Sequence, residues 1–146
     1  ARKLASYQGL SNEACEECFL AGLLHDIGKL ILAANAEGQY HLVLDLSRKA
    51  NLHLHQAEVG IFACNHAQIG AYLLALWGVP DSVIRAVEHH HSLDRANLKE
   101  FDQLLAVHLA QNLEPARKKQ LDMPILERLG LADRIPDWQE AIRVET

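Results

Sequence analysis

The stretch that decides the fold is His66-Ala-Gln-Ile-Gly-Ala-Tyr-Leu-Leu-Ala-Leu-Trp77, followed by Gly78-Val79-Pro80 and by Asp81-Ser-Val-Ile-Arg-Ala-Val-Glu-His-His-His91. Apolar residues recur through both long segments at helical spacing. The glycine and proline between them are typical of a helix end followed by a helix start. Because short connections favour antiparallel neighbours, the sequence predicts a helical hairpin of residues 66–77 and 81–91.

This hairpin predicts that histidines far apart in the sequence meet at one end. His66 lies 11 residues before Trp77, and His90 lies 10 residues after Pro80. At about 1.5 Å per residue, both lie about 15–16 Å from the turn. We therefore expect His66 and the run His89-His90-His91 at the same level. Three consecutive histidines cannot all face one ion, so one should face solvent or support a ligand.

Helical patterns continue on both sides of the hairpin, and no stretch alternates as a strand does. The further helical segments are expected at about 11–24, 30–36, 40–50, 58–63, 98–111, 124–129 and 136–144. Gly38 is expected to separate two of them, and residues 51–55 are polar and are expected to be irregular. The prediction is an all-α, single-domain helical bundle over residues 1–146.

Composition narrows the class of protein. Apolar residues make up 49% of the 146 residues and charged residues 23%, as in an ordinary globular protein. The net charge of −5, without a basic cluster, argues against nucleic acid as a partner. No signal peptide or 18-residue apolar span is visible, so we expect a cytoplasmic protein without membrane contact. The start, Ala-Arg-Lys-Leu-Ala, resembles the middle of a helix, so we expect a fragment of a longer protein.

Packing roles are expected for the conspicuous apolar and sulfur side chains. Cys15 and Cys18 form a C-x2-C pair in a helical pattern, but Cys64 alone does not complete a zinc site. An odd number of cysteines without a secretory signal disfavours a disulfide framework, so buried helical cysteines are expected. The large apolar residues expected at packed helix faces or bundle edges are Phe19, Leu23, Tyr72, Trp77 and Trp138.

A candidate metal site begins at the doublet His25-Asp26, which offers an imidazole and a carboxylate from adjacent residues. Neighbours on a continuous helix point about 100° apart, so both reach one ion only where the helix breaks. Gly28 is expected to supply that break. Lys29 then places a cation where a phosphate could sit. The alternative is a chance pair without a ligand role.

The other candidate ligands are His66, His90 and His91, which the hairpin brings to one level. A helix C-terminus that favours cationic side chains is the alternative explanation of the histidine run. Imidazole suits zinc, iron, nickel or copper, and an added carboxylate suits iron or manganese. We therefore expect a divalent metal, with Fe, Mn, Ni, Zn and Mg as candidates.

Four polar residues near these candidates have open interpretations. His53 and His55 lie in the polar stretch and are expected to be solvated. Glu58 either supports a metal ligand or is an exposed helix carboxylate. His108 either forms a hydrogen bond in the core or replaces a lost ligand.

The run Ala21-Gly-Leu-Leu-His-Asp-Ile-Gly-Lys-Leu30 resembles the signature of the HD superfamily of metal-dependent phosphohydrolases. Glu58, residues 66–80 and His90-His91 then resemble the HDOD branch in the same order. The resemblance implies an α-helical bundle of the HD-domain type with a mostly bacterial signalling role, often attached to a receiver or other regulatory domain. In the related HD-GYP group, which hydrolyses cyclic di-GMP, the ligand positions match His25, Asp26, His66, His90 and His91.

Three departures from that pattern bear on catalysis. Gln111 stands where the superfamily has an aspartate, and no histidine precedes His25. Ser92-Leu93-Asp94 stands where the HD-GYP group has its Gly-Tyr-Pro motif.

Two functions remain open from the sequence. The first is a non-catalytic signalling module with a degenerate pocket that works with other signalling domains or proteins. The second is a metal-dependent phosphohydrolase acting on a nucleotide or other phosphoester, with catalytic roles for Asp26 and Lys29.

Overall fold

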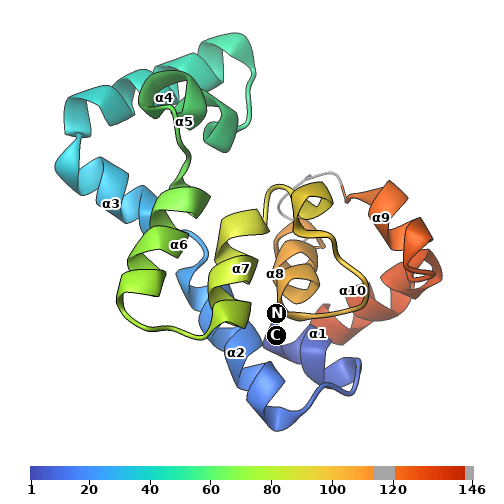
Figure 1. Cartoon of the computed structure of the whole chain (residues 1–146). Coiled ribbons are helices and arrows are strands. Elements are labelled where there is room, and N and C mark those ends of the chain that lie inside the picture. The colour runs from blue at the N-terminus through green and yellow to red at the C-terminus, as the bar shows by residue number, and fades with distance from the viewer. Residues whose placement is uncertain (114–120, 144–146) are drawn as a thin grey trace.

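The computed structural model describes residues 1–113 and 121–143, and every regular element in these ranges is helical (Figure 1). The elements are α1 (Arg2–Tyr7), α2 (Asn12–Leu24), α3 (Ile27–Asn35), α4 (Glu37–Ala50), α5 (Leu54–Phe62), α6 (His66–Leu76), α7 (Asp81–His89), η1 (Leu93–Ala96), α8 (Gln103–Asn112), α9 (Met123–Arg128), η2 (Ala132–Arg134) and α10 (Ile135–Arg143). The all-α prediction is confirmed. The predicted end of the last helix, residue 144, lies outside the described residues.

The predicted hairpin is formed by α6 and α7, which pack along each other. His66 is the first residue of α6, and His90 is the C-terminal cap of α7. Their ring centroids are 5.5 Å apart. The short connection Gly78-Val79-Pro80 therefore brings the two histidines to one end of the hairpin, as the residue count predicts.

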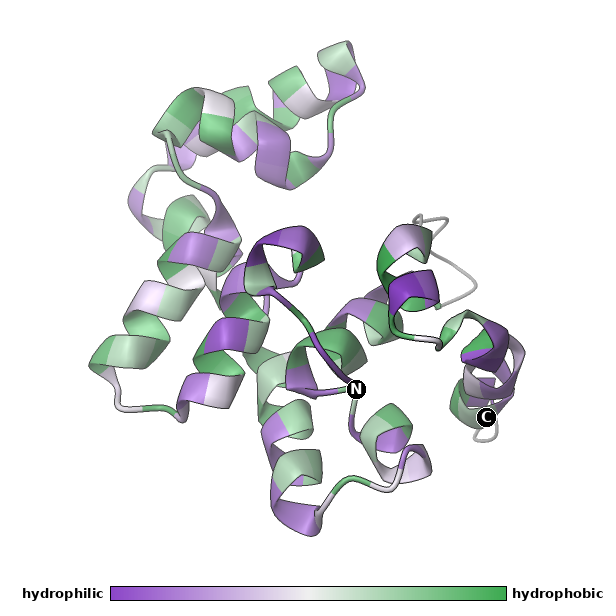
Figure 2. Cartoon of the chain, turned by 45° about the vertical axis from the view of Figure 1, so that its right-hand side comes forward, coloured by the Kyte–Doolittle hydropathy of each residue, from purple (hydrophilic) through white to green (hydrophobic). Residues whose placement is uncertain are grey.

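Most buried apolar side chains belong to one core, which we call the body, formed by α1, α2, α6, α7, α8, α9 and α10. Leu74, Leu104, Leu105, Leu126 and Trp138 are all fully buried there. Hydrophobic and hydrophilic residues are mixed along most of these helices (Figure 2), whereas α8 is buried over most of its length.

Helices α4 and α5 form a second hairpin, which we call the arm, and it projects from the body (Figure 1). The arm packs mainly against α3 and α6. Within its two helices the buried residues are Val43, Ala57 and Glu58. The arm therefore has a much smaller interior than the body, and one of its buried residues is a carboxylic acid.

Two glycines behave differently from the sequence prediction. The break between α2 and α3 lies at His25 and Asp26, and Gly28 is inside α3. A Cβ at position 28 would lie 2.0 Å from the backbone oxygen of His66, so only glycine allows α3 and α6 to approach this closely. Gly38 likewise does not separate helices, because α4 begins at Glu37 and runs through it.

Side-chain caps explain the other shifted helix starts. The helix expected from residue 98 begins at Gln103, because the Asp102 carboxylate accepts a hydrogen bond from the backbone N–H of Leu105 (3.0 Å). The helix expected from residue 58 begins at Leu54, inside the stretch expected to be irregular. There the side-chain oxygen of Gln56 accepts a hydrogen bond from the backbone N–H of His53 (3.1 Å), the residue that caps the helix.

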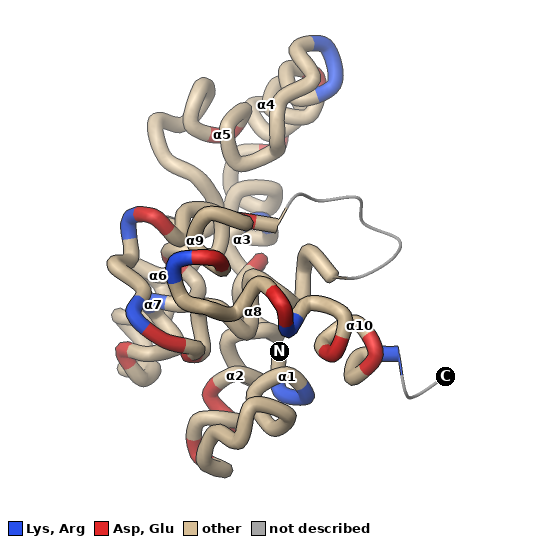
Figure 3. The backbone as a smooth tube through the Cα atoms, turned by 90° about the vertical axis from the view of Figure 1, so that its right-hand side faces the viewer, with Lys and Arg blue, Asp and Glu red and all other residues tan. Residues whose placement is uncertain are grey.

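The surface carries several apolar residues that were expected to pack. Phe19 is 51% exposed, Leu23 67%, Tyr72 69% and Trp77 62%, so those predictions are wrong, whereas Trp138 is fully buried. Cys15 and Cys18 are buried, as expected. Acidic and basic residues are interspersed along the chain (Figure 3). No single helix among the described residues has the length and apolar content to cross a membrane, and α5 with α6 reaches that length only as a pair bent by 77°.

Candidate metal centre

The candidate ligands come from three places in the body that meet at one point. His25 and Asp26 lie in the break between α2 and α3, where the chain no longer follows a continuous helix. His66 begins α6, and His90 and His91 follow the last residue of α7. The break thus allows adjacent residues to face the same side, and the hairpin brings the distant histidines to them.

Two of the histidines are held in one orientation by backbone carbonyl groups. The Nδ1–H of His25 donates to the oxygen of Gly22 (2.7 Å), and that of His90 donates to the oxygen of Val87 (2.6 Å). A carbonyl oxygen has no proton to give, so in both neutral rings the lone pair is on Nε2. No hydrogen-bond partner for the buried Nε2 of His90 is present among the described residues. Nε2 of His90 is thus placed to act as a metal ligand.

His66 is held in the same way by a carboxylate from the arm. Its Nδ1–H donates to Oε2 of the fully buried Glu58 (2.6 Å), which also accepts from the backbone N–H of His66 (2.8 Å). The Nε2 of His66 then lies 3.3 Å from Oδ1 of Asp26 and 3.0 Å from Nε2 of His91. A carboxylate behind a histidine is a recurring support for metal ligands because it orients the ring and increases its basicity.

The donor atoms are close enough to share an ion. One nitrogen each from His66, His90 and His91 lies within 4.8 Å of the other two. The rings of His25 and His90 are 5.2 Å apart, and Nε2 of His25 lies 3.5 Å from Oδ2 of Asp26. Imidazole nitrogens with one carboxylate are a donor set for zinc, iron, manganese or nickel. The residues present therefore fit a divalent metal ion.

Burial keeps two candidate ligands in the form that binds metal. It lowers the pKa of His90 to about 3 and also lowers the pKa of His25 below its ordinary value. Both rings are therefore neutral near pH 7, with a lone pair available on Nε2.

The pKa values of His66 and Asp26 are set mainly by groups of opposite charge. Burial alone would lower the pKa of His66, but its hydrogen bonds with Asp26 and Glu58 outweigh burial and raise it. Burial would raise the pKa of Asp26, but hydrogen bonds from His66 and Lys29 outweigh it and hold that pKa well below its usual range. Asp26 is therefore an ionised carboxylate next to the histidines.

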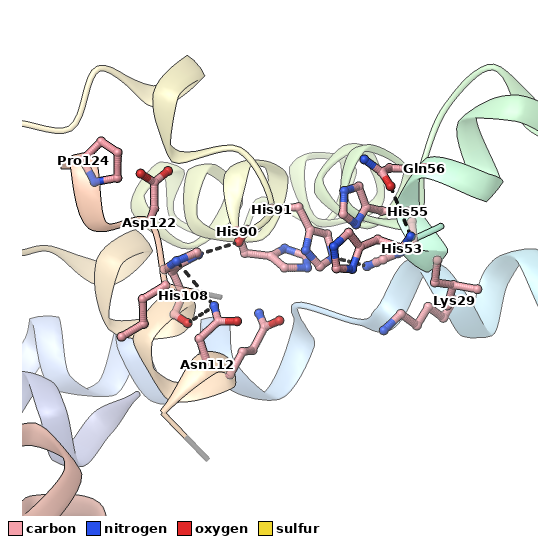
Figure 4. A pocket seen from close by; sticks show the side chains of 14 residues that line it. Lys29, His53, His55, Gln56, His90, His91, His108, Asn112, Asp122 and Pro124 are labelled. Carbon is pink, nitrogen blue, oxygen red and sulfur yellow. Dashed lines mark hydrogen bonds between the residues drawn. The ribbon is translucent and has the colours of Figure 1, made fainter. Parts of the chain in front are cut away.

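A pocket of about 530 Å³ opens beside the cluster (Figure 4). Lys29 lies at its wall with Nζ 2.6 Å from Oδ2 of Asp26. Gln111, at the position where the HD pattern has an aspartate, also lines it. His108 is buried, and its Nδ1 lies 3.1 Å from the backbone oxygen of His90. Of the two interpretations of His108, the structure supports the hydrogen bond in the core.

The arm makes two contributions to the site, of which sequence reasoning left one open and missed the other. Of the two interpretations of Glu58, the structure favours the one in which it supports a candidate ligand, because Glu58 is fully buried and bonded to His66. His55 was expected to be solvated, but its ring stacks on that of His91 with centroids 4.2 Å apart. The ring of His53 lies parallel to that of His55 at 5.6 Å. No local sequence pattern indicates such a stack.

Comparison with known proteins supports the resemblance seen in the sequence. A family profile described as HDOD domain matches residues 1–93. An uncharacterized protein of Treponema pallidum (strain Nichols) is 26% identical over 80 residues, which are 55% of this chain and 16% of that protein. The matched region is thus about a sixth of a longer relative. No solved structure matches the chain.

Proposed function

Because the chain belongs to the HDOD domain family, we propose that it is a regulatory module of bacterial signal transduction that binds one divalent metal ion without turnover of a phosphoester. The observation that carries the proposal is the common orientation of His25, His66 and His90. Each donates from Nδ1 to a fixed acceptor, so Nε2 is the ring nitrogen that would bind a metal ion, which in His66 would replace the proton shared with Asp26. Such preorganisation is costly to maintain in a buried site unless the nitrogens have a ligand.

The ion would be held by the five residues of the cluster: His25, Asp26, His66, His90 and His91. Nitrogen donors predominate, which favours Fe, Mn, Ni or Zn over Mg, an ion that prefers oxygen ligands. A bound metal would add positive charge and join α2, α6 and α7 at one point. It would thereby stabilise the folded body, because only that state presents the donor atoms together.

The absence of turnover is inferred from the balance of charge. Asp26 is the carboxylate that faces the imidazole nitrogens, and it also pairs with Lys29. The Oε2 of Glu58 already accepts two hydrogen bonds from His66. Gln111 contributes a neutral amide where the pattern has a carboxylate. The site therefore compensates the charge of one ion and is poorly suited to a two-metal centre.

The open pocket favours a second candidate, a metal-dependent phosphohydrolase. Its volume of about 530 Å³ is in the range of small-molecule sites, and Lys29 offers an ammonium group to a phosphate. In that function the metal would polarise a phosphoryl oxygen and lower the pKa of bound water. Lys29 would orient the phosphate while Asp26 remains ionised.

One experiment separates the candidates. The purified protein is analysed for metals and is then incubated with cyclic di-GMP and bis-p-nitrophenyl phosphate in Mn, Fe, Ni, Zn or Mg. We expect bound transition metal that is lost in His66→Ala, together with hydrolysis at background level. Metal-dependent hydrolysis abolished by Asp26→Ala would establish the phosphohydrolase instead. A protein that binds none of the five metals would contradict both candidates.

We further propose that the module works in the cytoplasm beside other signalling domains, such as a receiver domain in the same polypeptide. The support is the resemblance to the HDOD branch and the small share of the longer Treponema relative that the match covers. A phosphoester would be a ligand of the pocket, and nucleic acid and membranes are not expected partners of this acidic chain. Full-length protein in pull-down and fractionation experiments tests these assignments.

A further inference from the structure

His91 lies outside the helices, two residues beyond the end of α7, and its side chain is partly buried. Its Nε2 nevertheless lies 3.0 Å from Nε2 of His66. Two nitrogens bound at right angles to one ion at about 2.1 Å are about 3 Å apart, so this separation suits a shared ion.

The ring of His91 contacts three other imidazoles. Those of His90 and His66 are tilted against it by 48° and 87°, and both belong to the candidate ligands themselves. The third is His55, whose ring lies nearly parallel at 14° with centroids 4.2 Å apart (Figure 4). His55 comes from the first turn of α5 in the arm. It is the stacked ring that reaches His91 from outside the cluster.

His55 also stands between two hollows. Together with His91 and Gln56 it lines both the pocket beside the cluster and a second pocket of about 600 Å³. Removing the imidazole of His55 would widen the space between these pockets and take away the ring that stacks on His91. The ring of His91 could then rotate away from His66.

We propose that His55 is a positioning residue for His91, and that its stacked ring decides whether the metal has four or five protein ligands. The inference rests on the proposed metal site and adds a residue to it. The requirement is for a flat ring at position 55 and not for a nitrogen donor. The role also makes the site dependent on the arm, because α5 carries both His55 and the Glu58 that supports His66.

The test uses Co(II) as the probe, with affinity measured by chelator competition and ligand number read from the visible spectrum. We expect His55→Ala to weaken Co(II) binding about tenfold and to give the spectrum of His91→Ala. His55→Phe, which retains a flat ring, should bind Co(II) as the wild type does. His89→Ala is the matched control, since His89 lines the second pocket but does not stack on His91, and it should change neither readout.

A double variant distinguishes an effect of His55 on His91 from a general disturbance of the structure. If His55 acts through His91, His55→Ala adds no further loss of affinity to His91→Ala. Additive losses, an unchanged spectrum in His55→Ala, or a loss in His55→Phe equal to that in His55→Ala would each overturn the role of His55. In those cases wild type still binds Co(II) and His66→Ala still does not, so the metal site stands. If wild type binds no Co(II), the proposed metal site and this inference both fail.

Discussion

The body and the arm are built from similar amphipathic helices but are held together by different forces. The body encloses large side chains such as Leu74, Leu104 and Trp138, each with no exposed surface. The arm buries Val43 and Ala57, and its third buried residue, Glu58, is bonded to His66. Apolar burial therefore stabilises the body, whereas the arm is joined to it partly through the candidate metal centre.

This difference suggests a division of labour. A tightly packed body can hold His25, His66 and His90 in fixed orientations whether or not a ligand is present. A smaller element that touches the site through polar contacts can respond to it, because such elements open at lower free energy than the core. The following substitutions test whether the two regions differ in this way.

The largest effect is expected from a cavity in the body. Leu74→Ala removes a fully buried side chain of α6 and should lower the free energy of unfolding by about 2–5 kcal/mol. Leu76→Ala on the same helix is the control, because that side chain is 66% exposed and its loss should change stability by less than about 0.5 kcal/mol. Urea denaturation measures both. Equal effects would mean that the body is not packed as described.

A comparable loss is expected where α3 meets α6. In Gly28→Ala the new Cβ would meet backbone atoms of His66, which cannot move aside as a flexible side chain can. We expect a loss of about 3 kcal/mol in stability together with loss of metal binding. Thermal unfolding and Co(II) titration are the measurements. A stable variant with wild-type affinity would show that the two helices are less closely packed.

A smaller effect is expected at the contact between arm and site. Glu58→Gln retains an oxygen for the Nδ1–H of His66 but removes the negative charge behind the ring. Metal affinity should fall about 10–100-fold, or about 1.4–2.7 kcal/mol, as for other residues that support a ligand. Glu88→Gln on the surface of α7 is the control and should bind as the wild type does. Unchanged metal affinity in Glu58→Gln would show that the carboxylate of the arm does not support the metal site.

The smallest effect, of opposite sign, is expected within the arm. Gly38 lies in α4, and a Cβ there would meet nothing within 4 Å. Gly38→Ala should stabilise the protein by about 0.4–1 kcal/mol, because alanine restricts the unfolded chain without strain in the helix. Thermal denaturation tests it. Destabilisation would indicate that this glycine has a contact of its own.

Local patterns were sufficient for the general architecture. Helical spacing of apolar residues predicts the helices, and the short connection at residues 78–80 predicts the hairpin of α6 and α7. Counting residues along that hairpin places His66 level with His90. These predictions depend on the 3.6-residue period and on the short reach of a tight turn, both of which act between neighbours in the chain.

Prediction was less successful where one segment fits against a distant one. Asp102 was not recognised as the cap of α8. The apolar pattern begins before Asp102 and continues after it, so the pattern alone does not mark where the helix starts. Tyr72 and Trp77 were expected to pack because they are aromatic, but Tyr72 is exposed on α6 and Trp77 is exposed at the C-terminal cap of that helix. Burial of a single side chain depends on which helices are adjacent, and that information is not local.

The sequence by itself determined that this protein is an all-α chain of the HDOD type, in which His25-Asp26, His66 and His90-His91 are the candidate ligands. Only the tertiary structure decided how these residues are supported. The approach of α3 to α6 requires glycine at position 28, and the folding of the arm against α6 buries Glu58 behind His66 and stacks His55 on His91. The physical reason is that periodicity and turn chemistry act over a few residues, whereas orientation and burial arise from contacts between segments that meet only in the folded chain.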